Sequence, residues 1–219
     1  LVLMAKGREI SSFGYFFEAH EILSKIKADA DKLNVHNKTI FYVNYITNLV
    51  KCKFYKEALH TLENEFTIEN ALYKNMLLYN RLLCYLFLRD TKNLATYITY
   101  DLDSAPFPQN YMLKMIKSAY FYLIGEQETA ISIINSLLQA KSSSDNMQYY
   151  QPVAIIFKKL YTVSQKNSLQ KKWSEKDIKS LQDSIHEFEE TAPNEFKLVS
   201  TYLWLKDEIE HNLNKKHCS

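Results

Sequence analysis

A recurring spacing of small residues limits what this chain can fold into. The pattern is a small residue, a glycine seven positions later, and an alanine five positions after that. It is met twice, by Gly7, Gly14 and Ala19 and by Ser118, Gly125 and Ala130. The sequence contains three glycines, and all three lie on the pattern. Glycine is favoured where a helix ends in a left-handed residue or where two helices approach closely. The spacing therefore predicts pairs of helices joined by tight corners.

Two weaker copies of the pattern lie between the clear ones. In LVKCKFYKEALHTL, Lys53 takes the corner position and Ala58 follows five residues later. In YLFLRDTKNLATYI, we place Asp90 at the corner and Ala95 after it. The alanines at 19, 58, 95 and 130 are then separated by 39, 37 and 35 residues. A period of this length predicts stacked helical hairpins.

The segments FGYFFEAHEIL and LIGEQETAISII resemble tetratricopeptide repeats, whose unit is a helix–turn–helix of about 34 residues. The resemblance covers 1–140 and implies an all-α fold, a right-handed α-solenoid of about four antiparallel helix hairpins. The middle copies depart from it because they lack the corner glycine. Residues 141–219 are expected to form a C-terminal helical cap. The alternative is an irregular α-helical bundle.

The expected cap carries two local signals. Ser174 is a predicted N-cap, with Asp177 three residues later in the place of the usual Glu or Gln. Pro152 is compatible with a helix only within its first turn. The polar stretch 141–146 is read as the linker that closes the array.

Composition supports helices and excludes several classes of protein. Apolar residues make up 47% of the chain, while glycine and proline together number seven, which favours long helices with short connections. The net charge of +2 is too small to predict nucleic-acid binding. The longest nearly continuous apolar run, 82–88, is too short to span a membrane. The chain begins at Leu1 instead of Met, so we expect a fragment or processed form.

The three cysteines, Cys52, Cys84 and Cys218, are odd in number and widely spaced. This favours a reducing, cytoplasmic compartment, or a cytoplasm-facing domain, over a disulfide framework.

No motif for catalysis, a metal or a cofactor is present. There is no HExxH or CxxC arrangement, no GxSxG elbow and no glycine-rich phosphate loop. The acidic groups around Phe188 and Asp207 are read as solvated helix faces. The lysines between 158 and 172, with Trp173, could contact nucleic acid, but 174–210 carry a net charge of −6 that would offset them. We therefore expect a protein that is not an enzyme, with no metal, no cofactor and no nucleic acid.

The resemblance implies a concave groove lined by the first helix of each hairpin. Carried onto this sequence, the groove positions are Arg8, Ser11, Val43, Thr47, Lys51, Asn80, Cys84, Phe87, Met115, Ala119 and Tyr122. Asn80 could hydrogen-bond a ligand backbone, and Arg8 and Lys51 could hold an acidic group. The alternative is that Phe87, Met115 and Tyr122 are buried by neighbouring turns or by the C-terminal helices.

These readings predict a non-catalytic scaffold or adaptor that binds a protein or peptide in the groove, the ligand being an amphipathic or hydrophobic segment. One alternative is a peptide-sensing regulatory domain of a larger transcription regulator or membrane-anchored protein. Another is an enzyme with a site inside a helical bundle. A homodimer is also left open.

Overall fold

The computed structural model describes residues 2–65, 71–99, 107–140, 147–167, 173–197 and 199–214. All regular secondary structure in these ranges is helical, which confirms the all-α prediction. The chain divides into two compact units, Leu1–Asp90 and Thr91–Ser219, and each is described by itself. None of the helices in the described ranges is both long and apolar enough to cross a membrane. The expected linker at 141–146 and the C-terminal pair His217 and Cys218 lie outside the described residues.

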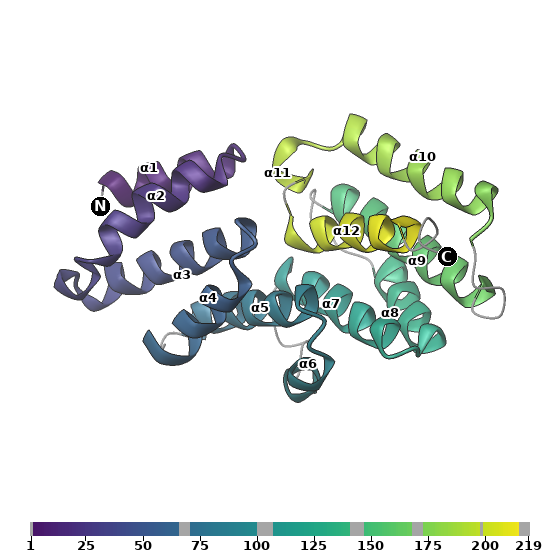
Figure 1. Cartoon of the computed structure of the whole chain (residues 1–219), viewed down its shortest axis with the longest axis horizontal. Coiled ribbons are helices and arrows are strands. Elements are labelled where there is room, and N and C mark those ends of the chain that lie inside the picture. The colour runs from purple at the N-terminus through teal and green to yellow at the C-terminus, as the bar shows by residue number, and fades with distance from the viewer. Residues whose placement is uncertain are drawn as a thin grey trace. The chain divides into compact units, whose positions relative to one another are not determined.

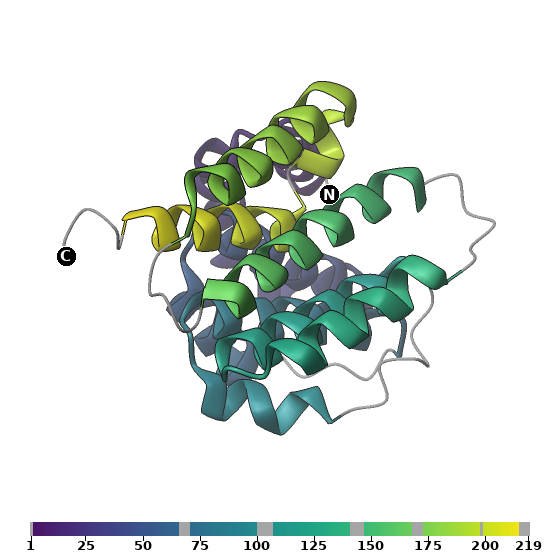
Figure 2. The same ribbon diagram turned by 90° about the vertical axis from the view of Figure 1, so that its right-hand side faces the viewer.

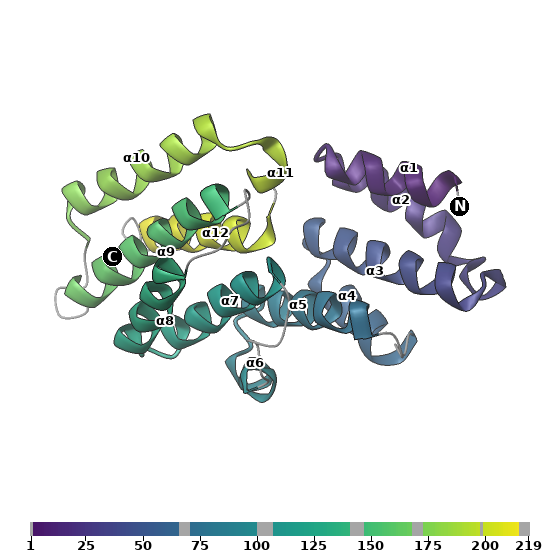
Figure 3. The same ribbon diagram turned by 180° about the vertical axis from the view of Figure 1, so that it is seen from behind.

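The first unit is built around its central helix, Val35–Lys51. Its elements are α1 (Val2–Ser12), α2 (Phe16–Lys27), the 3₁₀ turn η1 (Ala30–Lys32), α3 (Val35–Lys51), α4 (Tyr55–His60), the π-helical turn η2 (Thr61–Glu65) and α5 (Ala71–Phe87). Helices α1 and α2 pack on one side of α3, and α4 and α5 pack on the other (Figures 1 and 3). The buried face of α3 includes Phe41, Tyr45, Ile46 and Leu49. Burial of this apolar face supplies most of the stability of such a helix.

Four helices end in the same backbone corner. At Gly14, Lys53, Arg89 and Gly125, φ is positive, at 92°, 63°, 54° and 88°. At each corner this residue's N–H bonds the carbonyl three residues back, and the next N–H bonds the carbonyl five residues back. At the last corner these are Gly125 N–H to Tyr122 O at 3.1 Å and Glu126 N–H to Phe121 O at 2.8 Å. This is the Schellman ending of an α-helix, and it satisfies carbonyls that would otherwise lack partners. We call the left-handed residue the corner residue.

The third corner lies one residue earlier than predicted. Arg89, not Asp90, is left-handed, and the N–H of Asp90 bonds Tyr85 O at 2.9 Å. The residue five positions after the corner is therefore Leu94, which is fully buried, while Ala95 is partly exposed. The corners are 39, 36 and 36 residues apart. Their spacing is more regular than that of the alanines from which the repeat was inferred.

Close helix contact at Gly7 is confirmed. A Cβ built on Gly7 would lie 3.0 Å from Leu23 Cδ2, on α2. Leu23 is itself buried, so it has little room to move. A larger residue at position 7 would separate α1 from α2.

The second unit contains α6 (Thr91–Ile98), α7 (Gln109–Leu123), α8 (Gln127–Gln139), α9 (Met147–Asn167), α10 (Glu175–Thr191), α11 (Asn194–Lys197) and α12 (Ser200–Asn214). Helix α9 lies between α8 and α10 (Figure 2). Helix α12 contacts both α7 and α9. The predicted boundary after residue 140 falls between α8 and α9, which pack together here. The division of the chain into an array (1–140) and a cap (141–219) stays a prediction. It does not coincide with the division into two compact units, which falls after Asp90.

Two local signals can be checked in this unit. Ser174 is the N-cap of α10, as predicted, and its Oγ accepts the Asp177 N–H at 3.1 Å. The prediction for Pro152 was wrong. It is the sixth residue of α9 and so lies beyond the first turn. Because proline has no N–H, the Gln148 carbonyl loses its usual helical donor there.

Replacing Lys53 with glycine should stabilise the fold, because glycine adopts the left-handed conformation without steric cost. We expect the free energy of unfolding to rise by about 0.5–1 kcal/mol relative to Lys53→Ala. The alanine variant is the control, since it also loses the lysine side chain but keeps a Cβ. Gly125→Ala should destabilise by a similar amount, and a Cβ there would meet no atom within 4 Å. Urea unfolding of the three variants measures this, and equal stability of the Lys53→Gly and Lys53→Ala proteins would contradict it.

Candidate partner-binding site

In the first unit, α3 and α5 are the first helices of two successive hairpins, and one residue of each forms a contact between them. Between α3 and α5, Asn80 Nδ2 donates to Thr47 Oγ1 at 2.9 Å. Asn80 is 3% exposed and Thr47 is half-buried, so this hydrogen bond is partly buried. Thr47 lies six residues before its corner residue, and Asn80 lies nine before its own. This hydrogen bond joins α3 and α5 where the two helices pack together. We call this line of contact the α3–α5 seam.

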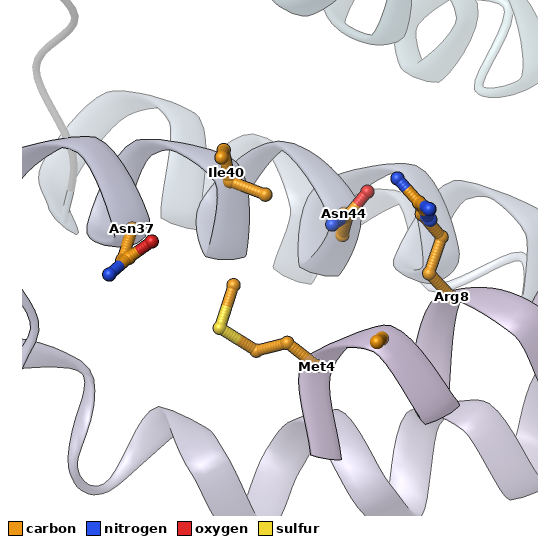
Figure 4. Close-up of a pocket in the computed structure, with 6 residues that line it drawn as sticks. Met4, Arg8, Asn37, Ile40 and Asn44 are labelled. Atoms are coloured by element: carbon orange, nitrogen blue, oxygen red, sulfur yellow. The ribbon is translucent and has the colours of Figure 1, made fainter. Parts of the chain in front are cut away.

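The same two positions between α1 and α3 are occupied by Arg8 and Asn44. Arg8 lies six residues before Gly14, and Asn44 lies nine before Lys53. Their side chains lie next to each other at one end of a cleft (Figure 4). Within the described part of the chain neither side chain has a hydrogen-bond or ion-pair partner. The equivalent positions are thus bonded in the α3–α5 seam and unbonded here.

The cleft at this place has a volume of about 260 Å³ and is lined by Met4, Ala5, Arg8, Asn37, Ile40 and Asn44. We call it the α1–α3 cleft. Met4 and Ile40 point toward each other in its middle, Asn37 lies at one end, and Arg8 and Asn44 lie at the other (Figure 4). Apolar walls with a few polar groups at the ends are typical of sites that bind a side chain or a small ligand.

Of the groove residues predicted in the first unit, Arg8 lines the cleft and the others make internal contacts. Ser11 is buried and accepts a long hydrogen bond from Asn48 Nδ2 at 3.4 Å. Asn48 Nδ2 also donates to Phe16 O at 3.1 Å, which ties α3 to the first corner. Lys51 Nζ lies 5.2 Å from the centre of the Phe16 ring, and burial lowers the pKa of this lysine. These contacts hold the hairpins together.

The groove residues predicted on α5 are out of register. The prediction placed the third corner at Asp90, whereas the corner residue is Arg89. The positions equivalent to Met115 and Tyr122 of α7 are then Tyr79 and Leu86. One residue turns the side chain by 100° around a helix. Phe87 accordingly stacks on Tyr55 of α4, with 4.6 Å between ring centres.

Sequence reasoning missed Met4, Ala5, Asn37, Ile40 and Asn44, the other residues of the cleft. One signal was present for Asn44. It lies 36 residues before Asn80, and both asparagines are nine residues before their corners. That equivalence becomes visible only after the third corner is placed at Arg89. Whether the other four residues line a cleft depends on which face of α1 packs against α3. The spacing of residues in the sequence does not determine that face.

In the second unit, the predicted groove residues Met115, Ala119 and Tyr122 are buried. Tyr122 stacks on Tyr161 of α9, with 4.9 Å between ring centres. Its hydroxyl donates to Glu208 Oε1 at 3.3 Å and accepts from Asn212 Nδ2 at 3.3 Å. Glu208 and Asn212 belong to α12. The second unit therefore agrees with the alternative prediction, in which C-terminal helices cover these positions.

The buried phenols and thiols are held in their protonated forms. Burial, reinforced by the Glu208 carboxylate, raises the pKa of Tyr122 to about 12. Burial also raises the pKa of Cys52 to about 11 and that of Cys84 to about 12. A thiol needs a lowered pKa to act as a nucleophile near neutral pH. Among the described residues, no three metal-binding side chains are grouped in a way that could hold an ion.

Comparisons of the chain with protein-family models, with curated proteins and with solved structures gave no match. The class of the protein is therefore defined by its own structure. It is an all-helical protein with recurring Schellman corners and a cleft between the first helices of its first two hairpins.

The pair Thr47 and Asn80 should be energetically coupled, whereas the equivalent pair Arg8 and Asn44 should not. A double-mutant cycle of Thr47→Ala and Asn80→Ala should give a coupling energy of about 1 kcal/mol, because the pair shares a partly buried hydrogen bond. The matched cycle of Arg8→Ala and Asn44→Ala should give a coupling within about 0.3 kcal/mol of zero in the absence of a ligand. Urea unfolding of the proteins in both cycles measures this. Equal coupling in the two cycles would contradict the distinction between a closed seam and an open cleft.

The Tyr122 contact should make stability fall at alkaline pH. The folded protein keeps the Tyr122 proton up to about pH 12, whereas an unfolded tyrosine loses it near pH 10. The folded state therefore binds more protons in this interval, and the free energy of unfolding decreases as pH rises through it. Tyr122→Phe should be less stable at pH 8 by about 1 kcal/mol and should lose less stability between pH 9 and 11. Parallel curves for the two proteins in urea unfolding would exclude this role.

Proposed function

We propose that this chain is a non-catalytic helical-repeat scaffold or adaptor that binds a protein or peptide, with the α1–α3 cleft as part of its binding surface. One observation carries the proposal. The positions that hydrogen-bond each other in the α3–α5 seam are left unbonded at the cleft, whose lining also includes Met4 and Ile40. Arg8 is exposed and offers five N–H donors, and Asn44 offers an amide.

The proposal includes the larger arrangement that the resemblance implies. Four corners with the same hydrogen bonds, 36 to 39 residues apart, support repeated hairpins of a tetratricopeptide-like, right-handed α-solenoid. In that arrangement the first helices line the concave face and the helices after residue 140 cap the array. A partner would meet a surface whose side chains are already held by the hairpins, which lowers the entropy lost on binding.

The state of the cysteines supports a reducing, cytoplasmic setting for this function. Cys52 and Cys84 are buried free thiols with raised pKa values, as expected of cysteines that act as small apolar residues. The Cys52 thiol also lies 3.2 Å from Phe16 O, beside the Asn48 contact at the first corner. Both residues thus contribute to packing.

Selection of peptides from a random displayed library against the whole chain tests the proposed function. We expect enriched peptides to bind with dissociation constants of about 1–100 μM, as is common for groove-bound peptides. Ile40→Asp should weaken them at least about tenfold, because it places a charge on the apolar wall of the cleft. Fluorescence anisotropy of a labelled peptide measures this, and circular dichroism confirms that the variant is folded.

The matched control is Val35→Asp. Val35 is the first residue of α3, is 83% exposed and lies outside the cleft, so this change adds the same charge to the same helix. Peptides that bind both variants equally well would place the binding surface elsewhere. Failure to enrich any peptide that binds better than about 1 mM would contradict the proposed function itself.

A further inference from the structure

Acidic residues are nearly absent from the helices that precede a corner. In the first unit, α1, α3 and α5 together carry six Lys and Arg residues and one acid, Glu9. In the second unit, α7 carries two lysines and no acid, and α9, which packs beside that hairpin, carries three lysines and no acid. The whole chain has 27 basic and 25 acidic residues, so the acids are concentrated elsewhere. On α1 the exposed residues Lys6 and Arg8 outnumber the one exposed acid, Glu9, and this local excess of positive charge suits an anionic partner.

In the second unit, helices with several acidic residues pack on a helix that has none. Helix α10 carries six acidic residues and α12 carries three, and both pack on α9. The carboxylate of Glu208 on α12 is turned inward, 4% exposed, and accepts from the Tyr122 hydroxyl of α7. Leu205 and Ile209, which share that face of α12, are buried beside it. An acidic amphipathic helix thus packs here with one carboxylate and two aliphatic side chains directed inward.

The α1–α3 cleft offers matching chemistry. Its apolar wall consists of Ile40, which is half-buried, and Met4, which is buried, and Arg8 and Asn44 provide N–H donors at one end of it (Figure 4). A guanidinium donates only, and the Asn44 amide nitrogen also donates, so one group with two acceptor oxygens satisfies both. A carboxylate is that group, and its hydrogen bonds to a guanidinium are charge-assisted. No acidic side chain among the described residues forms an ion pair with Arg8.

We infer that the α1–α3 cleft binds an acidic amphipathic helix of a partner protein, with one carboxylate of that helix between Arg8 and Asn44 and its apolar side chains on Met4 and Ile40. The inference rests on the proposed function and specifies the ligand of the same site. It predicts selectivity for a side-chain carboxylate on a helix over an extended segment.

The probe for this inference is a labelled synthetic peptide of roughly 18 residues, with leucine at i, i+3, i+4 and i+7 and with glutamate and alanine sharing the other positions, whose helicity is confirmed by circular dichroism. One control peptide has every glutamate replaced by glutamine, and another has the same composition in scrambled order. Fluorescence anisotropy with the full chain should show the acidic helix binding more tightly than both controls. Arg8→Gln should raise its dissociation constant about tenfold, and Asn44→Ala about threefold.

Lys6→Gln is the matched control for Arg8→Gln. Lys6 is exposed on the same helix and lies outside the cleft, so its loss removes the same charge. We expect a change of less than about twofold with Lys6→Gln. Equal weakening by the two variants would mean a diffuse attraction for anions and would overturn the inference. Displacement of the probe by duplex DNA, with equal sensitivity to both variants, would also overturn it and would point to a polyanion surface.

Other outcomes separate this inference from the proposed function. If library-selected extended peptides bind in an Ile40-dependent manner and the acidic helix does not bind below about 1 mM, the inference fails while the proposed function stands. If the glutamine peptide binds as tightly as the acidic helix, the site is apolar and the carboxylate assignment is wrong. If no peptide of either kind binds, both proposals fail.

Discussion

The left-handed corner residue is the constraint on which the rest of the described structure depends. With φ between 54° and 92°, it closes two backbone hydrogen bonds at the end of each first helix and starts the next helix two residues later. Because the corner fixes where each helix ends, it also fixes which side chains face the neighbouring hairpin. Counting back from the corner identifies the positions that meet in the α3–α5 seam and in the α1–α3 cleft. Local backbone geometry therefore determines contacts between residues far apart in the sequence.

Equivalent positions have different uses along the chain. Six and nine residues before the corner, Thr47 and Asn80 form a partly buried hydrogen bond, whereas Arg8 and Asn44 leave their polar groups at the end of an open cleft. In the second unit, the helix face that carries Tyr122 is covered by α12. Equivalent positions can thus form a packing contact in one pair of hairpins and line an open cleft in another while the corner geometry stays the same.

Several features could be read from the sequence because their causes are local. Gly14 and Gly125 mark corners since glycine tolerates positive φ, and Ser174 marks the start of α10 since its hydroxyl caps the helix. The third corner was misplaced because the pattern required an alanine five residues after the corner, which Ala95 supplied for Asp90, whereas Leu94 takes that position after Arg89. Of the cleft residues only Arg8 was predicted, because the others depend on how α1 meets α3. Burial of Met115 and Tyr122 follows from packing by α9 and α12, which come much later in the chain.

The two corners without glycine have a basic residue in its place. Lys53 and Arg89 each sit just past the C-terminal end of a helix, where the backbone carbonyls concentrate partial negative charge. A cation at that end gains an attraction that offsets part of the steric cost of the left-handed conformation. Mobile ions weaken such attractions, whereas the glycine corners carry no side-chain charge to screen. The integrity of the middle hairpins is consequently tied to ionic strength in a way that the first and last hairpins are not.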